Sequence, residues 1–192
     1  MKLLPPLVAL AALTMLGSTA SAKTATDNLE LQGVIVTNTC VIDQAQVNFG
    51  QLTESQVVAG RITQPFSLHM SCDGLSGAPS ALTFAGTPTN SRADRFAVGL
   101  GTEGTPDQDA DTAFQLSVDG TQLAWGTNAT DGHVIHPNED LLAAGGDIAP
   151  IDNGSSIELK LKLRVLQGAS GVDSTATLGH EVNTPIQVTM TY

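Results

Sequence analysis

The sequence is poor in aromatic residues and in positive charge, and both scarcities exclude classes of function. Phe, Tyr and Trp make up 4% of the 192 residues, so the sequence offers few residues for a sugar-binding site built on exposed aromatic rings. Lys and Arg number 8 against 19 Asp and Glu, which gives a formal net charge of −11. Nucleic acids and anionic lipid surfaces are bound through clustered Lys and Arg, so neither is an expected partner.

Motifs that carry catalysis or bind metals are also lacking. There is no G-x-S-x-G serine motif and no glycine-rich phosphate loop. Almost no residues therefore indicate a secreted hydrolase. His133 and His136 have no third ligand nearby in the sequence. The aspartates of 107–111 imitate a calcium loop, but Thr112 and Val118 stand where such a loop needs glycine and glutamate. We therefore expect solvated loops here, and no enzyme, metal or cofactor.

The one long apolar run stands at the start of the chain, from Leu3 to Leu16. It follows Lys2 and precedes Ala20-Ser21-Ala22, the order of a secretory signal peptide with its cleavage site. The run is shorter than the roughly 20 residues that cross a bilayer. We therefore predict a removable signal peptide at 1–22 and no membrane insertion of the mature chain. Removing 22 of 192 residues leaves 170, enough for one domain with a core.

Cysteine is scarce as well, with two residues in the whole chain, Cys40 and Cys72. An even count after a signal peptide indicates an oxidising compartment and one disulfide bond. Two thiols are too few for a typical metal site. The closed loop of about 33 residues predicts a contribution of roughly 3–4 kcal/mol to folding in the chain-entropy description of disulfides.

Alternation of apolar and polar residues dominates the predicted mature chain, and no segment shows a convincing helical period. The clearest alternation has five apolar residues with charged residues between them: Ile157, Leu159, Leu161, Leu163 and Val165. The last segment repeats the pattern with Ile186, Val188, Met190 and Tyr192. Strict alternation predicts strands with one buried and one wet face.

Further strands are predicted over 29–36, 65–71, 81–84 and 96–100. Residues 113–118, Asp119-Gly120 and 121–124 together predict a hairpin, because Asp-Gly suits a tight turn. Trp125 follows directly and reads as a packing residue. Strands at this spacing, separated by Gly, Pro, Asn and Asp, predict an all-β protein built as an antiparallel sandwich.

One ordered set of residues resembles a known family. It consists of Gly33–Val36, Cys40–Asp43, Val47–Gly50, Phe66–Leu68, Cys72–Asp73, Leu82–Gly86 and the final Tyr192. In this order, behind a signal peptide and a short alternating segment, the set resembles subunits of bacterial chaperone–usher fimbriae of the type 1 pilin kind. The resemblance covers essentially the whole mature chain.

This resemblance implies an immunoglobulin-like sandwich that lacks its seventh strand and is completed by a strand from another chain. The donor strand would be the N-terminal extension 23–32, and the pilin domain would be 33–192. On the donor, one face carries Ala25, Asp27, Leu29 and Leu31. Asp27 departs from the small residue that the family commonly has near this position. The strands at 157–165 and 186–192 are expected to flank the groove and to contact the chaperone.

The same resemblance implies partners and a location. The partners would be neighbouring fimbrial subunits, a periplasmic pilus chaperone and an outer-membrane usher. The chain would be a structural subunit of a fimbria on the bacterial surface, exported through the periplasm and supporting cell adhesion. The alternative is a self-sufficient secreted β-sandwich that acts as a binding module, for example for carbohydrate.

Overall fold

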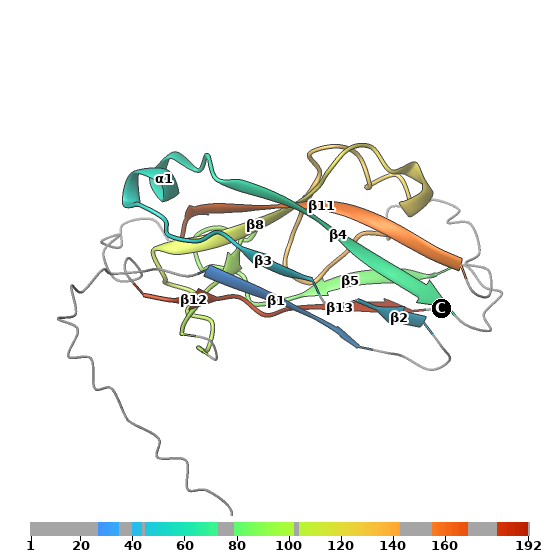
Figure 1. Cartoon of the computed structure of the whole chain (residues 1–192), viewed down its shortest axis with the longest axis horizontal. Helices are drawn as coiled ribbons and strands as arrows, with labels where there is room; N and C mark the ends of the chain where they lie inside the picture. Colours follow the sequence, from blue (N-terminus) through green and yellow to red (C-terminus); the bar gives the residue numbers. More distant parts are fainter. Residues whose placement is uncertain are drawn as a thin grey trace, which may run out of the picture.

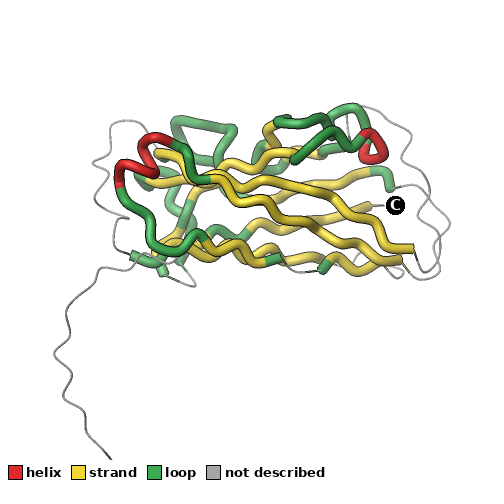
Figure 2. The backbone as a smooth tube through the Cα atoms, turned by 45° about the horizontal axis from the view of Figure 1, so that its top comes forward, coloured by secondary structure: helices red, strands yellow, loops and turns green. Residues whose placement is uncertain are grey.

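The protein is a sandwich of two β-sheets in a computed structural model (Figures 1 and 2). The structure describes residues 27–34, 40–43, 45–72, 79–101, 104–142, 155–168 and 180–191. In Figure 1, β4, β8 and β11 form one layer, and β1, β5, β12 and β13 form the other. The predicted all-β sandwich is confirmed. The predicted signal peptide at 1–22 lies outside the described residues.

The first sheet has seven strands among the described residues. These are β1 (Asp27–Val34), β3 (Gln46–Asn48), β5 (Ala81–Ala85), β7 (Gly99–Leu100), β10 (Glu139–Asp140), β12 (Val182–Asn183) and β13 (Ile186–Thr191). The strands follow the order β10-β5-β13-β1-β12-β7, and β3 pairs with β1. The two pairings of β1 with β12 and β13 are parallel, whereas the other pairings of this sheet are antiparallel.

The second sheet has six strands in the same part of the chain, and all its pairings are antiparallel. They are β2 (Cys40–Ile42), β4 (Thr63–Cys72), β6 (Phe96–Ala97), β8 (Thr112–Val118), β9 (Val134–Ile135) and β11 (Ser155–Gln167). Two short helices lie between strands: α1 (Glu54–Ala59), which the sequence pattern did not predict, and the 3-10 helix η1 (Leu123–Trp125).

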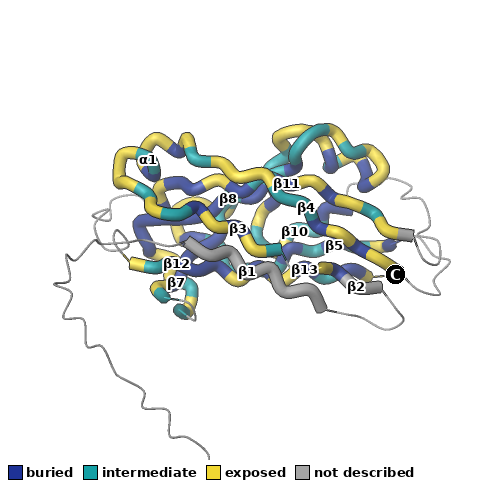
Figure 3. The backbone as a smooth tube through the Cα atoms, viewed as in Figure 1, coloured by how far each residue is buried: buried dark blue, intermediate teal, exposed yellow. Residues whose placement is uncertain are grey.

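Alternating side chains of both sheets fill the space between the layers. On β11, Leu159, Leu161, Leu163 and Val165 are fully buried, while the charged residues between them face outward (Figure 3). On β13, Ile186, Val188 and Met190 are buried in the same way. Phe49 stacks on Phe114 with ring centroids 5.5 Å apart. Burial of this apolar surface is the main force that holds the two sheets together.

The predicted hairpin after β8 is wrong in its second half. Residues 123–125 form η1 in place of a strand, and β8 pairs with β9 instead. The indole Nε1 of Trp125 donates a hydrogen bond to the Glu158 carbonyl oxygen at 3.0 Å, which ties this turn to β11. The buried indole therefore makes a packed turn more favourable than a second exposed strand.

Replacement of Trp125 by Phe is expected to lower the free energy of unfolding by about 1 kcal/mol, because the hydrogen bond to the Glu158 oxygen is lost. Urea unfolding followed by circular dichroism measures the change. Leu123→Ala is the matched control, since Leu123 lies in the same turn with 65% of its surface exposed. Equal effects of the two substitutions would show that the indole contact contributes nothing.

Among the described residues, the structure contains no helix with the length and hydropathy that crossing a membrane would require.

Candidate functional site

The candidate site is a strand position in the first sheet, between β3 on one side and β12 and β13 on the other. This strand slot is occupied by β1 of the same chain. Asn28 pairs with Asn48 of β3 along one edge and with Asn183 of β12 along the other. Further along, Leu31 to Val34 pair with Ile186 to Thr189 of β13. Figure 1 shows β1 running beside β13 in this layer.

The strands that flank the slot present buried aliphatic residues to the core. Val47 of β3 is 5% exposed, and Ile186 and Val188 of β13 are fully buried. The backbone register places Leu29 opposite Val47 and Leu31 opposite Ile186. Paired residues of neighbouring strands belong to the same face of a sheet. Positions 29 and 31 therefore belong to the core-facing set of the first sheet.

Two other predicted donor residues fall at the beginning of this segment. The register places Asp27 opposite Val182, which is 2% exposed, so position 27 continues the alternation of 29 and 31. Ala25 lies outside the described residues, as does Tyr192 at the other end of the chain. Within the described part, Asp27 thus marks the outer end of the slot, where β1 meets β12.

One predicted flank of the groove is wrong. The strand at 157–165 is β11, which lies in the second sheet and pairs with β4 along one edge and with β8 along the other. Its inward residues face the first sheet across the core and do not border the slot edge to edge. The reason is that alternation identifies a strand's buried face but not its neighbours, and both sheets bury one face.

The flank that sequence reasoning missed is β3. It spans Gln46–Asn48, with Val47 buried between two exposed residues. Three residues are too few for a convincing alternation. The sequence signal for this strand was the short alternation Val47-Asn48-Phe49 in front of Gly50. Val47 and Phe49 are both buried, and Asn48 between them is exposed.

The two cysteines occupy paired positions of neighbouring strands. The register of β2 and β4 places Cys40 directly opposite Cys72. Directly opposed residues of antiparallel strands have Cα atoms about 4.5–5.5 Å apart, and disulfide bonds span about 4.4–6.8 Å. The backbone is therefore compatible with the predicted bond, which would join the segment after β1 to the second sheet.

The residues considered for metal binding have hydrogen-bond partners of their own. Nε2 of His133 lies 2.9 Å from Glu139 Oε1, and the His136 amide donates to Glu139 Oε2 at 2.7 Å. In the acidic loop, the amide of Asp109 donates to Asp107 Oδ1 at 3.0 Å. Within the described ranges, no group of three potential metal ligands is found.

Comparison with solved structures places the fold among pilus subunits. The chain matches a subunit of a chaperone–usher pilus whose structure was reported for the molecular basis of rod uncoiling. The TM-score is 0.52 at 18% identity, over 96% of this chain and 99% of the other. It also matches the P pilus rod subunit PapA, with a TM-score of 0.53 at 18% identity, over 80% of this chain and 99% of the other. No curated protein sequence matches the chain.

The sequence itself matches the model of the family described as Fimbrial protein over residues 29–182. The match includes β1 from Leu29 onward, both cysteines and all of the second sheet. It therefore covers most of the chain and the strands on both sides of the core. The chain belongs to the fimbrial protein family and is a structural subunit of a surface pilus, not an enzyme.

Proposed function

We propose that this subunit is polymerised by donor-strand exchange, in which residues 23–32 of one copy enter the strand slot of the next. The observation that supports the proposal is the position of β1, an N-terminal strand inserted between β3 and β13. β1 precedes every other strand that the structure describes. It can therefore leave the slot without breaking any strand pairing except its own.

A vacated slot would be unfavourable in water. Two sheet edges would lose their hydrogen-bond partners, and the buried aliphatic residues beside them would be uncovered. Burial of a leucine contributes about 1.5–3 kcal/mol, so Leu29 and Leu31 together give a strong preference for a filled slot. A strand of the same sequence from another copy meets the same requirement.

Strand direction favours exchange over self-pairing. The chain's own β1 runs parallel to β13 and is covalently connected to β2 and β3 of the same chain. A strand from another copy has no such connection and is free to pair antiparallel to β13. Antiparallel ladders are slightly more stable per residue than parallel ones. Strand exchange would thus replace a parallel pairing with β13 by a more stable antiparallel one.

Delivery to the polymer is part of the proposal. The signal peptide at 1–22 would direct the chain to the periplasm, where the Cys40–Cys72 bond forms. A pilus chaperone would hold the slot, and an outer-membrane usher would exchange the chaperone for the next subunit's donor strand. The family match over residues 29–182 supports this route.

The experiment is co-expression with a pilus chaperone and usher, followed by detection of polymers that resist dissociation in detergent. The double substitution Leu29→Asp and Leu31→Asp should abolish these polymers, because two carboxylates would have to enter an apolar slot. Chaperone binding should persist, since the slot itself is unchanged. Gln32→Asp is the matched control, because position 32 alternates with the core-facing positions, and its polymers should form normally.

Loss of chaperone binding in the double variant would show that the two leucines belong permanently to the subunit's own core. Unchanged polymers in that variant would exclude residues 23–32 as the donor. A chain that remains a stable monomer under all conditions would instead support the self-sufficient binding module.

A further inference from the structure

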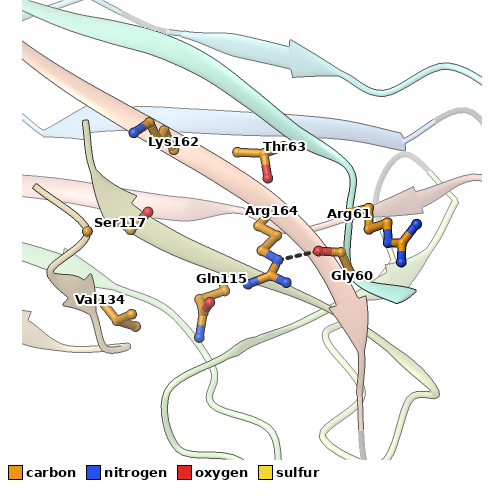
Figure 4. A pocket seen from close by; sticks show the side chains of 9 residues that line it. Gly60, Arg61, Thr63, Gln115, Ser117, Val134, Lys162 and Arg164 are labelled. Carbon is orange, nitrogen blue, oxygen red and sulfur yellow. Dashed lines mark hydrogen bonds between the residues drawn. The ribbon is translucent and has the colours of Figure 1, made fainter. Parts of the chain in front are cut away.

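The outer face of the second sheet carries a hollow of about 480 Å³, on the side of the sandwich away from the strand slot (Figure 4). This basic hollow is lined chiefly by polar and basic side chains: Arg61, Thr63, Gln115, Ser117, Lys162 and Arg164. The strand register sets Thr63, Arg164 and Gln115 in one row across β4, β11 and β8. Lys162 and Ser117 form the next row. The lining is therefore fixed by three strands of one sheet.

Three of the chain's few cations gather here, although the chain as a whole carries a net charge of −11. Lys162 is compensated, because its Nζ lies 2.7 Å from Asp119 and 3.3 Å from Asp131. Within the described residues, Arg61 and Arg164 form no ion pair. The hollow thus contains two guanidinium groups whose charge no carboxylate of the described chain neutralises.

Arg164 is held in place by the backbone. Its Nε donates a hydrogen bond to the carbonyl oxygen of Gly60, the residue that ends α1 (Figure 4). Gly60 has φ +54°, and a Cβ there would come within 3.1 Å of Arg164 Nη2. Among the described residues, no hydrogen bond to either Nη group of Arg164 is found, and this planar fork matches the two oxygens of a carboxylate.

The positive charge extends beyond the hollow. The pKa of Arg95 is lowered by burial, and repulsion from Arg92 and Arg164 adds to the lowering, while Asp94 acts against it. Arg92 and Arg164 are therefore each close enough to Arg95 to repel it, while Asp94 pairs with Arg95 at 4.0 Å. A single anion bound at Arg164 would relieve part of this repulsion.

The side chains, charge and volume of the hollow limit the class of anion that could bind there. A protein partner is disfavoured, because interface cores are rich in aromatic and apolar side chains, and Val134 is the one aliphatic side chain here. A polyanion is disfavoured by the acidic remainder of the surface. A small ligand with one charge is attracted locally, since distant charges are screened beyond about 8 Å at physiological salt. The volume lies within the range of small-molecule sites, about 300–1,000 Å³.

We propose that the basic hollow binds an acidic sugar, a sugar that carries one carboxylate. Arg164 and Arg61 hold the carboxylate, and the hydroxyls of Thr63 and Ser117 contact sugar hydroxyls. Gln115 donates its Nε2 to Asp94, which leaves its Oε1 as an acceptor. Recognition at this site depends on charge and hydrogen bonds, so the site does not need the exposed aromatic rings that the sequence lacks. The slot lies in the other sheet, so a donor strand that fills it does not enter this site.

The test is a titration of the isotope-labelled chain of residues 23–192 with glucuronic acid, and separately with glucose, followed by amide chemical shifts. Glucuronic acid should shift the amides around Arg61, Gln115 and Arg164, and glucose should not. Arg61→Gln and Arg164→Lys should each weaken binding about tenfold, the effect of losing one charge-assisted contact. High salt should weaken it too.

Lys160→Gln is the control, because Lys160 lies on the same outward face of β11, pairs with Glu158 at 3.8 Å and does not line the hollow. Its binding should equal that of the unmodified chain. Equal responses to both sugars, no response to glucuronic acid, or unchanged binding in both arginine variants would each overturn the proposal. Salt-sensitive association between copies, lost in the same variants without sugar binding, would show instead that this face docks a second copy.

Discussion

Removal of residues 23–32 is expected to leave a chain that is largely insoluble by itself and is restored by a synthetic peptide of the same ten residues. The truncation takes away most of β1, so β3 loses its partner and β13 keeps only the pairings with Gly33 and Val34 along that edge. Burial of two leucine side chains at positions 29 and 31 would contribute about 3–6 kcal/mol. Because domains are stable by only about 5–15 kcal/mol, a loss of this size brings the chain close to unfolding. Soluble yield and size-exclusion chromatography measure the effect.

Two arms make this experiment decisive. A peptide with Leu29→Asp and Leu31→Asp should fail to restore solubility, whereas one with Glu30→Lys should succeed, because position 30 alternates with the core-facing positions. A truncated chain with a copy of the segment fused after Tyr192 should be more stable than the natural monomer, since the fused strand returns antiparallel to β13. If the truncated chain unfolds at the same denaturant concentration as the full one, β1 is dispensable and the slot has no role.

Joint replacement of Cys40 and Cys72 by Ser is expected to lower the free energy of unfolding by roughly 3–4 kcal/mol, because a loop of about 33 residues is no longer closed in the unfolded chain. The register of β2 and β4 places the two residues opposite each other, so the bond would need no rearrangement of the backbone. Denaturant unfolding with and without reductant measures the difference. The reductant should destabilise the unmodified chain and leave the double variant unchanged.

Ser71→Ala provides the matched control for this pair, because Ser71 is the exposed neighbour of Cys72 on β4 and should change stability by less than about 0.5 kcal/mol. Two reactive thiols in the folded, unreduced chain would contradict the predicted bond directly.

Long alternating segments could be predicted from the sequence because burial on one face leaves its mark on every second residue. The strands around Leu161 and Val188 were predicted nearly to their ends for this reason. Which strands pair with one another could not be predicted, because the alternation of apolar and polar residues is the same in either sheet. That is why β11 was expected beside the slot and lies instead in the opposite sheet.

The turn after β8 was predicted in part. Gly120 adopts φ +75°, the conformation that the Asp-Gly signal requires, and its amide donates to Asp131 Oδ1 at 2.8 Å. The strand expected next is replaced by η1, because the buried contact of Trp125 is made with β11, which follows 30 residues later in the chain. Pairings across such distances leave no local pattern. The direction of β1 was unpredictable for the same reason, since it depends on β3 and β13 together.

In any assembly formed by strand exchange, the number of donor strands must be matched to the number of strand slots. Each copy has one donor strand and one strand slot, which is a vacancy once the strand has left it. In the monomer the strand fills the slot of its own chain, so neither is left to bind another copy. An open filament always has one unmatched strand at one end and one unmatched vacancy at the other, whatever its length. The two ends therefore differ, and each needs its own cap. A molecule that supplies a strand without a vacancy closes one end, and a molecule that supplies a vacancy without a strand closes the other.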